Sequence, residues 1–139
     1  MDRLTYINVA GKNYPMSFSL QTMKILAKKS GSVGNAISKI TDKELDADTI
    51  DMITEVLEML ITQGCAYKNY FEKDLPTKED DPVIDGKWTP LPKEVLEIGL
   101  QLRDMDAVAK AIEECVDIGQ EKEVTAIEDD SKNMEAGQV

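Results

Sequence analysis

The chain has 139 residues and a net charge of −11, and 42% of its residues are apolar while 31% are charged. This length and composition predict one globular domain and exclude a chain that is disordered throughout. An acidic surface repels phosphate backbones and anionic lipid heads, so that neither a nucleic acid nor a membrane is expected as a partner.

The first predicted element is a β-hairpin over residues 4–18. Its two stretches carry the alternating apolar and aromatic residues of strands, and the turn between them holds Gly11 and Asn13. Ser19 follows the hairpin directly, and its hydroxyl can cap a helix. That helix has apolar residues at helical spacing, which indicates one shared apolar face made of Leu20, Met23, Leu26 and Ala27.

A second short helix is predicted over residues 33–40, followed by a polar linker over residues 41–47. The strongest helix comes next, over about residues 49–73, with Asp48 as its N-cap. Its main apolar seam contains Ile50, Ile53, Leu57, Leu60, Gly64, Tyr67 and Phe71. A second line beside that seam contains Met52, Val56, Met59 and Gln63. So wide an apolar sector indicates either burial at the centre of the fold or a helix shared with a second chain, and central burial is favoured.

Residues 74–92 are predicted to form an irregular loop, because they hold four of the five prolines and proline removes a backbone donor. Long connections of this kind are uncommon in compact domains unless they are functional or disordered. The single Trp88 is interpreted either as a side chain that pins the loop to the helices or as an anchor for a partner. Asp81 and Asp85 do not make a calcium loop, because two ligand positions of the EF-hand pattern hold a valine and a proline.

Two further helices are predicted after the loop. Residues 93–102 place three apolar side chains on one side, backed by Leu96, and these are Val95, Ile98 and Leu102. Asp104 or Asp106 can cap the last helix, which is predicted to end near residue 118 with Gly119 as its stop. Its inward residues are predicted to be Val108, Ile112, Cys115 and Val116.

The fold is therefore predicted to be α+β and mostly α. A single helical domain over residues 1–119 packs its N-terminal β-hairpin on a bundle of about five helices. Residues 120–139 are predicted to be a disordered, flexible acidic tail, because they hold too few apolar side chains to offset the entropy of ordering. The whole excess of negative charge lies in residues 74–139, which hold eighteen acidic and seven basic residues.

The residue pattern supports no catalytic or metal-binding site. The chain has no histidine, which removes the usual general base near neutral pH and the commonest metal ligand. Cys65 and Cys115 lie within apolar helical patterns and are interpreted as small buried hydrophobes. We therefore predict no enzymatic activity, no cofactor and no metal, and we expect the protein to act by binding another protein.

Methionine fills irregular gaps in a core, but it also lines binding surfaces that adapt to a partner. The second line of the long helix is where such a surface is predicted. The candidate partner-binding residues are Met52, Val56, Met59, Tyr70 and Trp88.

Residues 4–73 carry a family resemblance. The residues that match are Tyr6-Ile-Asn-Val-Ala-Gly-Lys-Asn-Tyr-Pro-Met-Ser-Phe-Ser-Leu20, followed by Met23, Leu26 and a break at Gly31. This pattern, with the long apolar helix after it, resembles the small tail assembly chaperones of long-tailed bacteriophages and prophages. Residues 74–92 have no counterpart in that pattern.

The resemblance implies a non-enzymatic protein of the host bacterial cytoplasm that is absent from the mature virion. Such chaperones bind and solubilise the long helical tape-measure protein and recruit tail-tube subunits around it. A cytosolic location also agrees with the lack of a secretory signal and of any apolar run near the roughly 18 residues that span a bilayer. In many relatives a ribosomal frameshift adds a C-terminal domain, and a flexible end would suit such a joint.

Two alternatives stay open. The chain could be another non-enzymatic phage or prophage interaction protein, such as a head–tail connector, an anti-repressor or a host-directed inhibitor. A gene shared in one operon with the tape-measure protein would favour the chaperone. A homo-oligomer that forms through the long helix or the hairpin edge is also compatible with the sequence.

Overall fold

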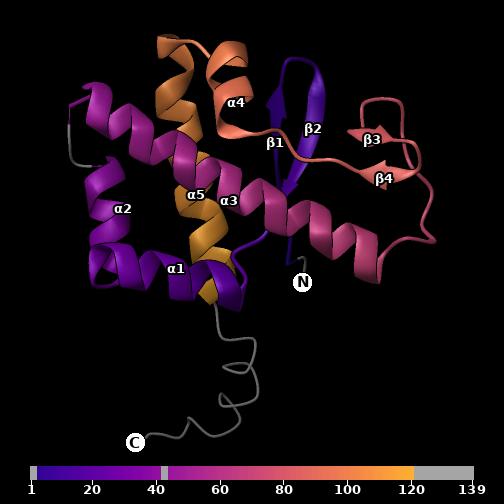
Figure 1. Cartoon of the computed structure of the whole chain (residues 1–139), viewed down its shortest axis with the longest axis horizontal. Coiled ribbons are helices and arrows are strands. Elements are labelled where there is room, and N and C mark those ends of the chain that lie inside the picture. The colour runs from indigo at the N-terminus through magenta and orange to yellow at the C-terminus, as the bar shows by residue number, and fades with distance from the viewer. Residues whose placement is uncertain (1–2, 42–43, 121–139) are drawn as a thin grey trace, which may run out of the picture.

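A computed structural model describes residues 3–41 and 44–120 of the chain (Figure 1). Its strands are β1 (Thr5–Val9), β2 (Lys12–Met16), β3 (Val83–Ile84) and β4 (Lys87–Trp88). Its helices are α1 (Leu20–Ser30), α2 (Val33–Thr41), α3 (Ala47–Phe71), α4 (Lys93–Gly99) and α5 (Met105–Gln120), with a 3₁₀ turn η1 (Leu102–Asp104). The predicted class, α+β and mostly α with an N-terminal hairpin, is confirmed. Of the tail predicted over residues 120–139, residues 121–139 lie outside the described residues.

The N-terminal hairpin is tighter than predicted. Its turn consists of Ala10 and Gly11 alone, both with positive φ (52° and 88°), which is the backbone of a type I′ turn. Glycine adopts such angles freely, and the Asn8 side chain supports the turn by accepting a hydrogen bond from the Gly11 N–H at 3.2 Å. Lys12 and Asn13, which the sequence placed in the turn, belong to β2.

Helix α3 lies at the centre of the fold, as its wide apolar sector predicted. It crosses the molecule from side to side, and α5 crosses behind it (Figure 1). The fully buried side chains that it supplies are Ile53, Val56, Leu57, Leu60, Ile61 and Cys65. Its N-cap is Asp46 and not Asp48, because the Asp46 carboxylate accepts the hydrogen bond from the Thr49 N–H at 2.8 Å. The helix ends at Phe71, two residues earlier than predicted.

The hairpin packs on α3 with almost no gap between the two backbones. Gly64 faces the Pro15 carbonyl of β2 so closely that a Cβ atom at this position would overlap it. Next to this contact, the Ser17 N–H donates to the Leu60 carbonyl at 3.1 Å. The glycine in the α3 seam therefore serves the close approach of the hairpin.

Helix α1 begins as predicted, because the Ser19 hydroxyl accepts a hydrogen bond from the Thr22 N–H at 3.2 Å. The buried face of α1 differs from the predicted apolar face. Thr22 and Leu26 are buried, whereas Leu20 is 77% exposed and Met23 also lies at the surface. The Ser19 hydroxyl also bonds the Gln63 side chain of α3 at 2.6 Å, which fixes the end of α1 in this rotation. The second short helix, α2, matches its predicted range to within one residue.

The loop over residues 74–92 is not wholly irregular, because it contains the short hairpin β3–β4. Its turn is Asp85–Gly86, with positive φ at both residues (52° and 80°). An Asp-Gly pair is a strong signal for a type I′ hairpin turn. Trp88 follows the turn and is buried, so that its indole ring packs in the core.

Helix α4 ends at Gly99, three residues before the predicted end at residue 102. Leu96 is its buried residue, whereas Val95, Ile98 and Leu102 are exposed. Two polar contacts hold the other side of α4 on α3. The Lys93 N–H donates to the Glu58 carboxylate at 2.8 Å, and the Thr54 hydroxyl donates to the Glu97 carboxylate at 2.7 Å.

Helix α5 has the predicted inward residues, Val108, Ile112, Cys115 and Val116. It starts at Met105, because Asp104 closes η1 by accepting a hydrogen bond from the Gln101 N–H at 2.8 Å. Gly119 does not stop the helix, which runs on to Gln120, the first residue of the predicted tail. A Cβ atom on Gly119 would lie 2.6 Å from the Phe18 Cβ, so this glycine allows the end of the hairpin to pack on α5.

None of the helices in the described ranges has the length and hydropathy that a bilayer crossing requires.

Candidate protein-binding surfaces

The five residues proposed to bind a partner do not form one surface. Val56 and Trp88 are buried in the core. Met52 and Met59 are half-buried and pack against the core, while Tyr70 is 78% exposed. Met52 and Tyr70 are eighteen residues apart on α3, which separates them by about 27 Å along the helix axis. Of the predicted set, Tyr70 offers most of its side chain to a partner.

Trp88 pins the loop to the helices, which was the first of its two interpretations. Its backbone N–H donates to the Asn69 side-chain oxygen at 2.9 Å, and the Asn69 amide donates back to the Trp88 carbonyl at 3.0 Å. The Lys68 ammonium lies 5.0 Å from the centroid of the indole ring. These contacts fasten β4 to α3 and leave little of the indole for a partner.

The end of α3 carries a cluster of aromatic side chains, Tyr67, Tyr70 and Phe71, which we call the aromatic end. The Phe71 ring centroid lies 5.0 Å from that of Tyr67 and 6.4 Å from that of Tyr70. Phe71 is 73% exposed, although the sequence placed it in the buried seam. Phe71 is the last residue of α3, and at this end of the helix the other elements no longer cover the apolar seam.

Positive charge borders the aromatic end. The Arg3 guanidinium lies 5.4 Å from the Tyr67 ring centroid, and the Lys68 ammonium lies 5.6 Å from that of Tyr6. Burial opposes the charge on Lys68, but its hydrogen bond with Glu72 and its contact with Tyr6 together raise its pKa above the ordinary value. Lys68 is therefore charged at every physiological pH.

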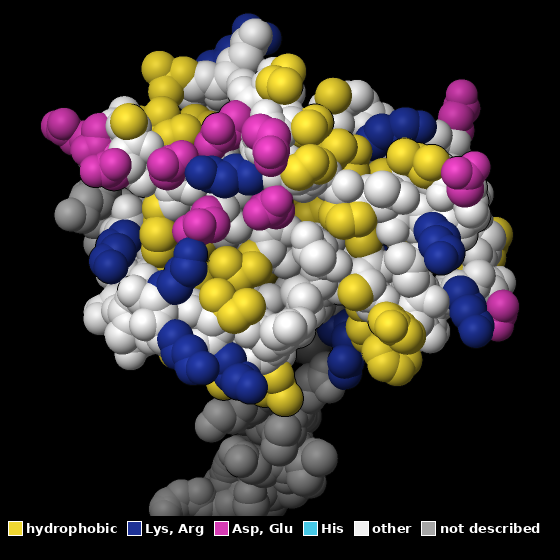
Figure 2. Space-filling model, viewed as in Figure 1, with side chains coloured by type: hydrophobic (Ala, Val, Ile, Leu, Met, Phe, Trp, Pro, Cys, Tyr) yellow, Lys and Arg dark blue, Asp and Glu magenta, His cyan; other side chains and the backbone are white. Residues whose placement is uncertain are grey.

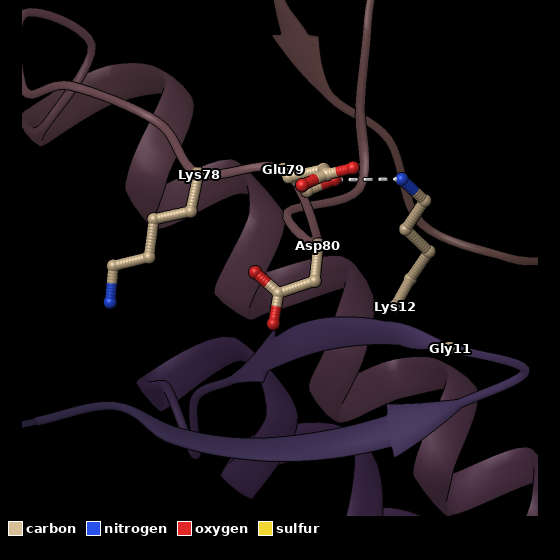
Figure 3. A pocket seen from close by; sticks show the side chains of 5 residues that line it. All are labelled: Gly11, Lys12, Lys78, Glu79 and Asp80. Atoms are coloured by element: carbon tan, nitrogen blue, oxygen red, sulfur yellow. Dashed lines mark hydrogen bonds between the residues drawn. The ribbon is translucent and has the colours of Figure 1, made fainter.

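A polar hollow of about 610 Å³ lies between the turn of the first hairpin and the loop, lined by Gly11, Lys12, Lys78, Glu79 and Asp80 (Figure 3). The Lys12 ammonium donates to the Glu79 carbonyl at 3.0 Å. The Asp80 carboxylate accepts a hydrogen bond from the Asn13 side chain at 2.7 Å, and the Asp80 carbonyl accepts one from the Asn13 N–H at 2.9 Å. These bonds cover the outer edge of β2 and tie the loop to the hairpin.

The exposed apolar stripe of α4 and η1 is the surface that sequence reasoning missed. Its residues, Val95, Ile98 and Leu102, had been recognised as one apolar side of a helix but not as a binding surface. Ile98 is 81% exposed and Leu102 is 65% exposed. The signal for exposure is the polar side of the same helix, where Lys93 pairs with Asp51 of α3 and Glu97 accepts the Thr54 hydroxyl.

Both cysteines are free thiols buried in the core. Burial raises the pKa of the Cys65 thiol to about 12 and that of the Cys115 thiol to about 11. Because the thiolate is the reactive form, neither cysteine should react with a disulfide reagent such as DTNB at pH 8 while the protein is folded. Both should react in denaturant. Rapid release of one equivalent of chromophore from the native protein would contradict this burial.

Within residues 3–41 and 44–120, no three Cys, Asp or Glu side chains converge in a way that could hold a metal ion. The described surface exposes apolar side chains at several places, and the aromatic end and the stripe on α4 and η1 are two of them. Compared with protein-family models, curated proteins and solved structures, the chain matches none of them. The function must therefore be argued from these surfaces and from the resemblance of residues 4–73.

Proposed function

We propose that this protein is a phage tail assembly chaperone that binds the tape-measure protein, keeps it soluble, and helps to recruit tail-tube subunits. It acts without enzymatic chemistry in the host bacterial cytoplasm and is left out of the mature virion. The identity of the partners rests on the resemblance of residues 4–73. The choice of the binding surface rests on which apolar side chains the structure leaves exposed.

The aromatic end is the observation that carries this proposal. Tyr70 and Phe71 leave about three quarters of their surface in water, at 78% and 73% exposure. Aromatic side chains supply large contact area with few rotatable bonds, which is why they dominate the energetics of many interfaces. A tape-measure protein exposes long apolar stripes until the tail tube encloses it, and such stripes need a soluble cover. The acidic remainder of the chain provides that solubility.

The predicted groove along Met52, Val56 and Met59 has a smaller part in the proposal than it had from the sequence alone. Val56 lies in the core, so a charge there would damage the fold before it could report on binding. Met52 and Met59 pack against the core with only part of each side chain free. The primary contact is therefore assigned to Tyr70 and Phe71.

The test is a double variant, Tyr70→Ser with Phe71→Ser, co-expressed with a tape-measure protein from the same genome. We expect the soluble amount of that protein to fall at least about fivefold, because two exposed anchors are removed. Leu20→Ser is the matched control, since Leu20 is 77% exposed on α1, and it should leave solubility unchanged. A double variant that melts like the native protein and still solubilises its partner would refute the assignment of the aromatic end.

A further inference from the structure

We propose that the outward face of α4 and η1 binds an amphipathic helix of a partner protein, one whose apolar stripe is flanked by Lys or Arg side chains. The surface consists of Val95, Ile98 and Leu102, which we call the α4 stripe. It goes beyond the proposed function, because it is a second surface and does not depend on the tape-measure protein. Helix α4 lies beside residues 51–58 of α3, and Phe71 is about 20 Å further along that helix.

The α4 stripe has the spacing of a helix-binding surface. Val95 and Ile98 lie one turn apart on α4, at i and i+3, which is the spacing that helix-binding surfaces use. Leu102 lies in η1, after the extended residues Leu100 and Gln101, and adds a third exposed apolar side chain. The helix cannot turn this stripe inward. Its opposite side is fixed on α3 by buried Leu96, by the bond from the Lys93 N–H to Glu58, and by the bond from the Thr54 hydroxyl to Glu97. The stripe is thus presented rigidly to solvent.

The residues that follow Ile98 border an adjoining hollow of about 530 Å³ between β1 and the start of α5. Its lining mixes apolar and polar side chains from β1, from the segment after α4 and from α5, and these include Ile7, Asn8, Leu100, Asp104 and Ala107. An open hollow of this size can seat the end of one long side chain of a partner helix that lies along the stripe. A partner helix on the stripe could therefore contact the hollow as well, because Gly99 and Leu100 follow Ile98 directly and line it.

Asp104 lines the hollow, and Glu94 and Asp106 are exposed acids close to the stripe in sequence. The bases in residues 93–106 are Lys93 and Arg103, while Glu97 faces α3, where it accepts the Thr54 hydroxyl. The charge of Lys93 is already matched, because its ammonium lies 2.8 Å from the Asp51 carboxylate and 3.9 Å from that of Glu97. Figure 2 shows acidic side chains gathered over the region of α4 and the N-terminal half of α3, with apolar side chains among them.

The negative charge near the stripe indicates which kind of partner can bind there. A second copy docked on the same face would bring the two acidic rims together, and like charges in an interface cost free energy. Anionic lipids are repelled for the same reason. An apolar helix with Lys or Arg flanks satisfies the stripe and the rim together, since opposite charges also speed the encounter.

The test uses two fluorescent helical peptides of about 18 residues with the same leucine stripe, one flanked by lysine and the other by glutamate. Fluorescence anisotropy measures their affinity for the full-length protein. We expect the lysine-flanked peptide to bind at least about tenfold more tightly than the other. Ile98→Ser and Leu102→Ser should each weaken its binding at least about tenfold, whereas Leu20→Ser should not.

A charge-matched pair of variants separates the acidic rim from the net charge of the chain. Glu94→Gln with Asp106→Gln should weaken the lysine-flanked peptide, whereas Glu113→Gln with Glu114→Gln, which removes the same charge further along α5, should have little effect. The inference is overturned if the lysine-flanked peptide does not bind, if both peptides bind equally, or if neither Ile98→Ser nor Leu102→Ser weakens binding. None of these outcomes requires the tape-measure protein, so the proposed function stands or falls separately.

Discussion

Gly64→Ala should lower the free energy of unfolding by about 3 kcal/mol. The new methyl group would overlap the Pro15 carbonyl and lie 2.7 Å from the Met16 N atom, and both belong to the backbone of β2. A side chain could rotate away, but a strand backbone can move only by lifting the hairpin from α3. Urea unfolding followed by circular dichroism measures the loss.

Gly34→Ala is the control for this substitution. Gly34 lies in α2, and a Cβ atom there would meet nothing closer than the Ser32 hydroxyl at 3.9 Å. Alanine is the better helix former, so this variant should be as stable as the native protein or up to about 1 kcal/mol more stable. Equal stabilities for the Gly64 and Gly34 variants would contradict the close contact between β2 and α3.

Leu57→Ala should also lower the free energy of unfolding by about 3 kcal/mol, because it removes a fully buried side chain at the centre of α3 and leaves a cavity. Leu102→Ala makes the same chemical change on an exposed residue and should cost less than about 0.5 kcal/mol. A large loss for Leu102→Ala would mean that Leu102 is buried, and would remove this residue from the docking surface proposed for α4 and η1.

Most of the fold was predictable because the deciding signals are local. Alternation, a glycine in the turn and the Ser19 cap define the first hairpin and the start of α1, and the apolar density of α3 indicates its central place. The errors arise where contacts between elements decide. Gly119 looked like a helix stop, but its missing side chain makes room for Phe18. On α4 the sequence showed apolar residues but not which of them is covered, and in the packed structure Leu96 is buried while Ile98 is exposed.

The candidate site was less predictable than the fold, because exposure depends on tertiary packing. Val56 and Tyr70 both lie on α3, yet the first is covered by other elements and the second extends beyond them. Trp88 satisfies the composition of a binding hot spot, but the paired bonds with Asn69 place it in the core. A pattern in the sequence identifies apolar faces, whereas only the packed structure shows which of them remain open.

One co-expression measurement decides whether the proposed chaperone role holds. A tape-measure protein from the same genome is expressed with and without this chain, and its soluble fraction and co-purification are measured. We expect the partner to be insoluble alone, to become soluble with this chain, and to co-purify with it on a column. A partner that is equally soluble in both cultures and does not co-purify would refute the chaperone role.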